Sequence, residues 1–426
     1  MTRAGASKVE ISAATVGADL MGYANRGAGA LSVHDPLFAR ALVVESGSSQ
    51  VAICTLDLCA VGEDVVAAAR ERIAARTTIA PENVLVAATH THSGPFDDDR
   101  SCWPDGLEAR IAEAVEQAIA RLRPARVGAG WGHLPGHAVN RRRLEDPVDP
   151  AVFVLRVDDP DGAPLAVLYG FGCHPVVLGP DNRDVSADWP AGAADVIESH
   201  LGADVVALFA QGACADVNPL TEGVRERLAS GATVRVQVEG IGYYGSAGDR
   251  LPEFDVGDRT GGTFAEAQRL GTAVAQEVLR VHGGIVTGEV TGLWTRRLAI
   301  ARPGAGSAPT GPLGFHGVPR AAPGDPIEVM LLGIDGPGVV LVGQPGEVFA
   351  QTGVGLRRDL RAAGVRHPFV VGYANGWRAY LTPREAYADG GYEVDWARAV
   401  GHAPSLQDDV RSAVLACAKG KEPSCR

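Results

Sequence analysis

A short apolar run that ends in two histidines constrains this chain most. Residues 84–86 predict a buried strand, which leads directly to His90 and His92. Side chains two positions apart in extended backbone point to the same side, so this spacing aims both imidazoles at one spot. Imidazole is the commonest metal ligand and the usual general base near neutral pH. The strand end is therefore a candidate metal or catalytic site, although two hydrogen-bonded structural histidines would give the same pattern.

Two further apolar runs lead to residues of the same chemistry. Residues 168–171 are strand-like and precede His174-Pro175, where the proline marks the end of the regular structure. Residues 338–342 form another run, and Glu347 follows it before a helix-like stretch. Acids also favour the first turn of a helix for electrostatic reasons. Two His and one Glu that leave one coordination position open nevertheless form the usual outline of a catalytic zinc site.

Composition indicates an ordinary globular protein. Of the 426 residues 46% are hydrophobic, enough for a core, and 54 Gly with 27 Pro indicate many loops. The net charge of −12 argues against nucleic acid and anionic membranes as partners. The N-terminus lacks the apolar core of a signal peptide, and we find no apolar run of about 18 residues. We therefore expect no membrane insertion, and a cytoplasmic protein with reduced cysteines.

Strand-like and helix-like segments intermingle along the chain. This mixture predicts an α/β (mixed α+β) fold of large mixed β-sheets flanked by helices. We expect one catalytic domain over residues 1–426, with loop insertions at 221–263 and 302–326 near the site. The strand-like runs are 38–45, 50–56, 84–86, 152–155, 165–169, 205–209, 285–295, 328–332, 339–342 and 369–371, and the helix-like runs are 62–76, 107–122, 191–200, 264–281, 348–361 and 406–417.

A set of ordered motifs spans most of the chain. They are Gly22-Tyr23-Ala24, Thr89 through Pro95, Asn140-Arg141, Cys173-His174-Pro175, Ser186-Ala187-Asp188, Phe209 through Ala213, Pro345-Gly346-Glu347, Asn375 through Tyr387 and Gly391-Tyr392-Glu393. By these motifs the chain resembles the catalytic N-terminal domain of the neutral/alkaline (non-lysosomal) ceramidase family.

The resemblance implies one zinc ion per chain, held by two His, a Glu and a Tyr: His90, His174, Glu347 and Tyr380. Tyr373 and Tyr387 flank Tyr380 and are alternatives for the tyrosine. The resemblance also implies that His92 and Arg141 line the site. A His, His and carboxylate set would accept manganese or iron as well.

One departure from the family pattern bears on the chemistry. Ceramidases carry an essential Ser in a Ser-Pro-Asn segment, and this chain has Asn218 near that position. Ceramidases also continue into an immunoglobulin-like C-terminal domain, whereas this sequence ends soon after Glu393. We therefore expect a ceramidase-like hydrolase with a smaller, more polar substrate. It would cleave a C–N amide bond, in an N-acyl or lactam-type small molecule, by metal-activated water without a Ser nucleophile.

Catalytic roles are expected for three side chains. His92 is a candidate acid/base or hydrogen-bond donor to an oxyanion, and Arg141 a candidate clamp on an anionic group. Asn218 could donate a hydrogen bond to the substrate.

Four more residues are candidates for supporting the site or contacting the substrate. Asp57 lies at another strand end and would fix a histidine tautomer. Asp188 precedes Trp189-Pro190, which is equally typical of a helix cap. Cys214 and Asp216 lie beside Asn218 in the sequence.

Other functions fit the same residues. A zinc lactonase or esterase, or a ring-closing biosynthetic enzyme, would use the same site. A thiol enzyme would use Cys214 as nucleophile and His92 as base. A catalytically inactive metal-containing binding protein would explain the missing Ser. The expected partner is a small-molecule substrate, and the sequence leaves a homo-oligomer open.

Overall fold

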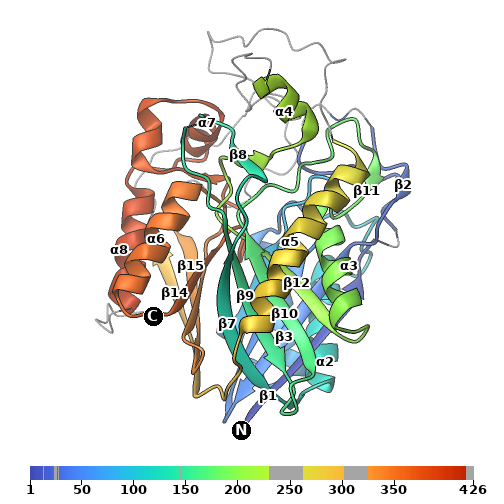
Figure 1. Ribbon diagram of the computed structural model, residues 1–426, viewed down its shortest axis with the longest axis vertical. Helices are drawn as coiled ribbons and strands as arrows, with labels where there is room; N and C mark the ends of the chain where they lie inside the picture. The colour runs from blue at the N-terminus through green and yellow to red at the C-terminus, as the bar shows by residue number, and fades with distance from the viewer. Residues whose placement is uncertain are drawn as a thin grey trace.

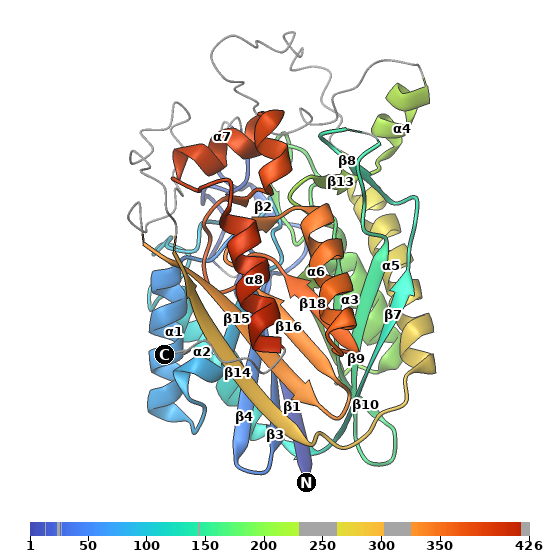
Figure 2. The ribbon, with the colours of Figure 1, turned by 90° about the vertical axis from the view of Figure 1, so that its left-hand side faces the viewer.

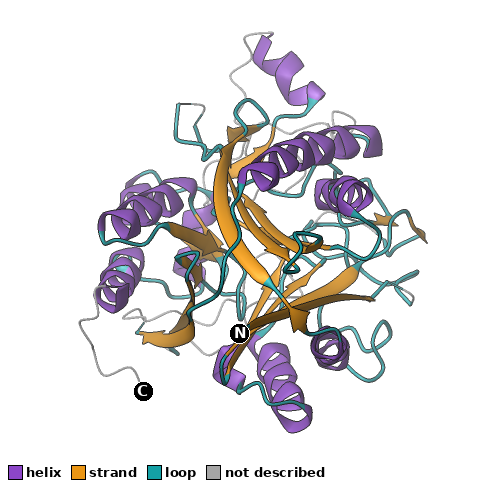
Figure 3. Cartoon of the chain, turned by 60° about the horizontal axis from the view of Figure 1, so that its bottom comes forward, coloured by secondary structure: helices purple, strands orange, loops and turns teal. Residues whose placement is uncertain are grey.

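The chain folds around three β-sheets that share one core, with the helices on the outside. The computed structural model describes residues 1–12, 14–23, 26, 28–143, 145–229, 262–301 and 325–418. Leu42, Phe153 and Leu341, one from each sheet, are buried in a single hydrophobic cluster. Seen from the N-terminal end of the molecule, the strands occupy the centre and the helices surround them (Figure 3).

The first sheet has five strands in the order β5-β4-β3-β1-β6. Its strands pair antiparallel except β4 and β5, which are parallel. The strand-like runs predicted over 38–45 and 50–56 are confirmed, and they pair as the hairpin β3–β4. The strands are β1 (Thr2–Glu10), β3 (Phe38–Ser46), β4 (Ser49–Leu56), β5 (Val84–Ala88) and β6 (Arg123–Pro124), and helices α1 (Glu63–Arg76) and α2 (Leu107–Ala120) pack on it.

The second sheet has the order β12-β10-β9-β7, and its β10–β12 pair is parallel. Helices α3 and α5 pack against each other and cover its outer face (Figure 1). The elements are β7 (Arg126–His133), β9 (Ala151–Asp158), β10 (Pro164–Phe171), β12 (Val206–Gln211), α3 (Trp189–Leu201) and α5 (Phe264–Gly284).

The third sheet has the order β14-β15-β16-β18, and its β16–β18 pair is parallel. Helices α6 and α8 lie side by side on its outer face (Figure 2). The elements are β14 (Gly292–Ile300), β15 (Ile327–Asp335), β16 (Val339–Gly343), β18 (His367–Val371), α6 (Ala350–Ala362) and α8 (Leu406–Ala418).

Short strand pairs and small helices gather at the end of the molecule opposite the N-terminus (Figure 2). The pairs are β2 (Ser32–Val33) with β11 (Asp184–Val185), β8 (Ala138–Asn140) with β13 (Val217–Pro219), and β17 (Glu347–Val348) with β19 (Tyr380–Leu381). The small helices are α4 (Glu222–Ala229) and α7 (Tyr392–Ala399), with the 3-10 turn η4 (Arg384–Ala388). A second 3-10 turn, η1 (Pro81–Asn83), lies at the other end of the first sheet, directly before β5.

The mixed α/β architecture confirms the predicted fold class, with local differences. β1 was missed, because a strand rich in Ala, Gly and charged residues shows no apolar run. The run predicted over 285–295 starts as a strand only at Gly292. Residues 230–261 and 302–324, most of the two predicted insertions, lie outside the described residues. The single-domain assignment stays a prediction.

Candidate active site

Three strand ends bring two histidines and a glutamate together. His90 follows β5, His174 follows β10, and Glu347 opens β17 soon after β16 ends. One ligand atom from each lies within 4.8 Å of the others. The Glu347 Oε2 atom is 3.4 Å from His174 Nε2 and 3.7 Å from His90 Nε2. All three side chains are buried. The two histidines and the glutamate that the strand ends predicted as metal ligands therefore lie together in the structure.

Backbone carbonyls hold both imidazoles with Nε2 directed toward Glu347. His90 Nδ1 donates to the Cys59 carbonyl at 2.7 Å, and His174 Nδ1 donates to the Val217 carbonyl at 3.0 Å. Burial lowers the pKa of each ring to about 3, so both are neutral at pH 7. A neutral imidazole whose other nitrogen is held by a carbonyl has its Nε2 lone pair free for a metal.

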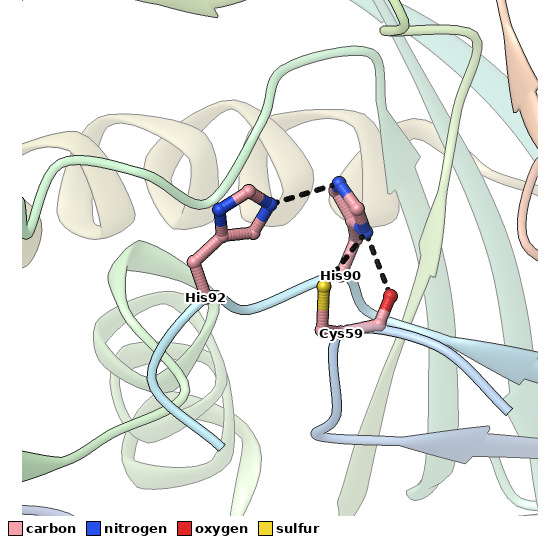
Figure 4. Close-up of side chains that lie close together, drawn as sticks. All are labelled: Cys59, His90 and His92. Atoms are coloured by element: carbon pink, nitrogen blue, oxygen red, sulfur yellow. Dashed lines mark hydrogen bonds between the residues drawn. The ribbon is translucent and has the colours of Figure 1, made fainter. Parts of the chain in front are cut away.

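His92 and Cys59 lie on either side of His90 (Figure 4). His92 Nε2 is 3.1 Å from His90 Nε2, and Cys59 Sγ is 3.6 Å from His90 Nδ1. Burial lowers the pKa of His92 well below its usual value. The three residues form a second group whose ligand atoms are close enough to hold a metal. The spacing of the two histidines indicated this convergence, but nothing in the apolar run around Cys59 did.

Two of the three candidate tyrosines contact Glu347. The Tyr380 phenol hydrogen-bonds its carboxyl group, and Tyr380 pairs with Glu347 between β17 and β19. Tyr373 Oη donates to Glu347 Oε2 at 3.3 Å, and its ring stacks on His90 with centroids 4.0 Å apart. Tyr387 Oη instead donates to the His402 carbonyl. The geometry thus leaves Tyr380 and Tyr373, and removes Tyr387, as the fourth ligand.

Arg141 reaches the site but is already paired. Its Nε donates to Glu393 Oε1 at 2.9 Å and its Nη2 to Tyr380 Oη at 3.1 Å. Its Nη1 lies 3.4 Å from Asn218 Oδ1 and 3.5 Å from His174 Nε2. Burial works against the Arg141 charge, but Tyr380 and Glu393 raise the pKa of the guanidinium well above its usual value. Each of the three guanidinium nitrogens of Arg141 thus already has a protein partner, and its predicted role as a clamp on an anionic substrate group stays a prediction.

Glu393 is the partner that the sequence did not single out. It is fully buried on α7, and its Oε2 also accepts from Arg142 Nη1 at 2.5 Å. Burial raises the pKa of its carboxyl group, but the two arginines outweigh this and keep the pKa below its usual value. The signal available beforehand was its place in the last of the ordered motifs.

Asn218 and Asp216 lie on and beside β13, and they differ in role. Asn218 Oδ1 accepts from Arg141, which leaves its amide nitrogen as a donor. Asp216 accepts from Asn140 Nδ2 and from the backbone N–H of Ala350, both at 2.8 Å. Asn218 therefore contacts Arg141 in the site, whereas Asp216 connects the segments that carry Asn140 and Ala350.

Asp57 does not contact a histidine, which corrects its predicted role. Its carboxylate forms a buried ion pair with Arg40 and accepts the Phe38 backbone N–H at 3.0 Å. The histidines follow β5, which pairs with β4 on one side. Asp57 follows β4, and its side chain contacts β3 on the other side of that strand.

Asp188 is the N-cap of α3. It accepts from the backbone N–H groups of Trp189, Leu178 and Val177, and burial raises its pKa to about 7. Through these bonds it shapes the segment after His174, as the capping interpretation predicts.

The position of Cys214 does not support the alternative of a thiol enzyme. Cys214 is buried, and its Sγ lies 3.4 Å from Tyr373 Oη. Burial raises the pKa of the thiol, whereas a nucleophilic cysteine needs the pKa lowered. No hydrogen bond joins Cys214 to His92, and Cys214 contacts the site through Tyr373.

Left-handed backbone marks the same region. In the described part of the chain five non-glycine residues have positive φ: His90 (71°), Asp188 (61°), Tyr373 (53°), Asn375 (61°) and Ala379 (53°). Four of them lie in the ordered motifs, and the fifth, Tyr373, is a candidate ligand. Such conformations cost about 1–3 kcal/mol each and cluster at functional sites. The strain therefore supports the strand ends as the functional end of the molecule.

Comparisons with known proteins find similarity to neutral ceramidases. Residues 3–103 match the family model described as neutral/alkaline non-lysosomal ceramidase, N-terminal. The neutral ceramidase of Pseudomonas aeruginosa is 26% identical over 92% of this chain and 68% of its own length. That of Mycobacterium tuberculosis is 25% identical over 92% and 73%.

Solved structures share the fold. A crystal structure of neutral ceramidase from Pseudomonas aeruginosa superposes with a TM-score of 0.75 at 22% identity, covering 98% of this chain and 74% of the other. A structure described as ceramidase complexed with C2 gives a TM-score of 0.76 and covers 98% of this chain and 75% of the other.

Within the described residues, no helix is long and apolar enough to cross a membrane.

Proposed function

Since the chain belongs to the neutral/alkaline ceramidase family, we propose that it is a zinc-dependent hydrolase of a C–N amide bond. The substrate we propose is a small N-acyl or lactam-type molecule. The observation that carries the proposal is the convergence of His90, His174 and Glu347, buried and within 4.8 Å of one another.

The donor set fits zinc. Two neutral imidazoles, each with its second nitrogen held by a carbonyl, and one carboxylate match the ligands of a catalytic zinc site. Tyr380 or Tyr373 is placed to add a phenol oxygen. When bound, the ion would supply a Lewis acid and a water activated at neutral pH.

His92 is the group placed to move the proton. Its Nε2 lies 3.1 Å from the His90 nitrogen that would bind the metal. Its Nδ1 is buried and has no hydrogen-bond partner among the described residues. A ring kept neutral by burial beside the reacting centre can take a proton from water and return it to the leaving amine.

Asn218 and Arg141 support a water nucleophile. An amide side chain is a poor nucleophile, so Asn218 in place of the family's Ser favours direct attack by water without a covalent intermediate. The Asn218 amide nitrogen can donate to the carbonyl oxygen of the substrate. Arg141, neutralised by Glu393, keeps Tyr380 and Asn218 in place.

Metal analysis combined with an amidase assay tests the proposal. We expect about one zinc per chain in the wild type by plasma mass spectrometry, and loss of that zinc in His174→Ala. Release of glycinamide from N-hexanoylglycinamide should vanish with it. His34→Ala is the matched control, because this exposed imidazole stacks on Phe264. A wild type that is folded, never exposed to a chelator and free of stoichiometric metal would contradict the proposal.

A further inference from the structure

Gly22 and Tyr23 cover one face of His92. Gly22 has a φ of 117°, and a Cβ there would lie 2.3 Å from His92 Cγ, so only glycine permits this approach. The Tyr23 ring meets the His92 ring edge-on, with centroids 4.8 Å apart. Tyr23 Oη donates to the Leu178 carbonyl at 2.7 Å, which fixes the ring.

Arg26 lies on this tyrosine, and two of its three guanidinium nitrogens make no hydrogen bond within the described residues. Its guanidinium carbon is 4.9 Å from the centroid of the Tyr23 ring, and its Nη1 donates to the Leu20 carbonyl at 3.2 Å. Its Nε and Nη2 are buried, and among the described residues they have no hydrogen-bond partner. A buried guanidinium with unpaired N–H groups is costly, and an anion would relieve that cost.

The charged groups around Arg26 place it beside the cluster. The Arg26 guanidinium interacts electrostatically with Tyr23, Cys59 and Asp181, and also with His92. Asp181 supplies the nearby carboxylate. Across the described chain, however, no hydrogen bond or ion pair joins Asp181 to Arg26.

The two unused donors form the edge of a guanidinium that binds carboxylates. Nε–H and Nη2–H are parallel and match the two oxygens of one carboxylate. Among the described residues, two arginines show this edge on both oxygens of one carboxylate. Arg378 binds Glu63 through Nε and Nη2 at 2.5 and 2.7 Å, and Arg280 binds Glu277 through them at 2.7 and 2.6 Å.

We propose that Arg26 binds a carboxylate of the substrate through Nε and Nη2, so that the preferred substrates are N-acyl amino acids. This inference rests on the proposed amide hydrolysis for the position of the scissile bond. It gives Arg26 the anion-binding role that the sequence suggested for Arg141.

Calorimetry with uncleavable ligands tests the binding. The probes are the ketone analogues of N-hexanoylglycine and N-hexanoylglycinamide, in which a methylene replaces the amide NH. A hydrogen-bonded charge pair contributes enough that the zinc-loaded wild type should bind the carboxylate at least about tenfold more tightly than the carboxamide. Arg26→Gln should abolish this ratio, and Arg26→Lys should keep part of it.

A distant arginine provides the control. Arg121→Gln, at the C-terminal end of α2, should keep the wild-type ratio, because within the described chain the hydrogen bond of its side chain goes to the Ala6 carbonyl, away from the candidate site. Thermal unfolding of every variant checks the fold. Equal affinity of the wild type for the two probes, or a ratio unchanged in Arg26→Gln, would overturn the inference.

Hydrolysis separates the two proposals. If the wild type cleaves N-hexanoylglycinamide and prefers no carboxylate, the inference about Arg26 fails and the amidase function stands. If the wild type binds the carboxylate probe preferentially and cleaves neither amide, the Arg26 site stands and the amidase function fails.

Discussion

Two arginines near the cluster differ in how their donors are used. Arg141, beside His174, directs its N–H groups to Glu393, Tyr380 and Asn218. Arg26, beside His92, leaves Nε and Nη2 without a partner in the described chain. The difference indicates that the His174 side of the site is complete by itself, whereas the His92 side is built to receive another group.

This contrast explains why one arginine is expected to position residues and the other to bind. A guanidinium with a partner on each nitrogen is held in place, and its charge is balanced before any ligand arrives. An unsaturated one retains its hydrogen-bonding capacity for a ligand, at a cost to the stability of the free protein.

Removing the Glu393 charge should have the largest effect. Glu393→Gln leaves Arg141 and Arg142 buried without a carboxylate, so we expect the free energy of unfolding to fall by about 3–5 kcal/mol. Denaturant titration measures it. Asp389→Asn is the control, because this half-exposed residue pairs with Arg143 and should cost at most about 1 kcal/mol. If Glu393→Gln lowered the free energy of unfolding by less than about 1 kcal/mol, the Glu393 charge would not be what holds Arg141 and its partners in place.

Replacing Tyr380 and Tyr373 one at a time should show which of the two tyrosines is the fourth metal ligand. Tyr380→Phe removes a candidate ligand and unpairs Arg141 Nη2, so we expect zinc affinity to fall by more than about 100-fold. Tyr373→Phe removes one hydrogen bond to Glu347, so a fall of about tenfold is expected. Competition with a chromophoric chelator measures both affinities. The reverse order would make Tyr373 the fourth ligand.

Removing the Arg26 charge should have the smallest effect on stability. Arg26→Met gives up the contact with Tyr23 and one hydrogen bond, but it also removes two buried nitrogens that have no partner among the described residues. We therefore expect the free energy of unfolding to stay within about 1 kcal/mol of the wild type. A loss as large as that of Glu393→Gln would mean that Arg26 is paired in the free protein, and the contrast would be lost.

Much of the fold and of the candidate cluster could be predicted from local patterns. Apolar runs predicted β5, β10 and β16 before His90, His174 and Glu347, because a buried strand needs a continuous apolar stretch. Contacts between the three sheets then place these strand ends in one region: the Ala88 backbone N–H donates to the Tyr373 carbonyl, and the Gly372 N–H donates to the Gln211 carbonyl.

The sequence by itself determined which residue types could hold a metal and where the strands that carry them end. Tertiary structure alone decided the partner of each buried charge. Glu393 on Arg141, Arg40 on Asp57 and the unpaired edge of Arg26 all depend on contacts between distant segments. Hydrophobic periodicity reports on one element at a time, whereas the pairing of a buried charge depends on where several elements meet.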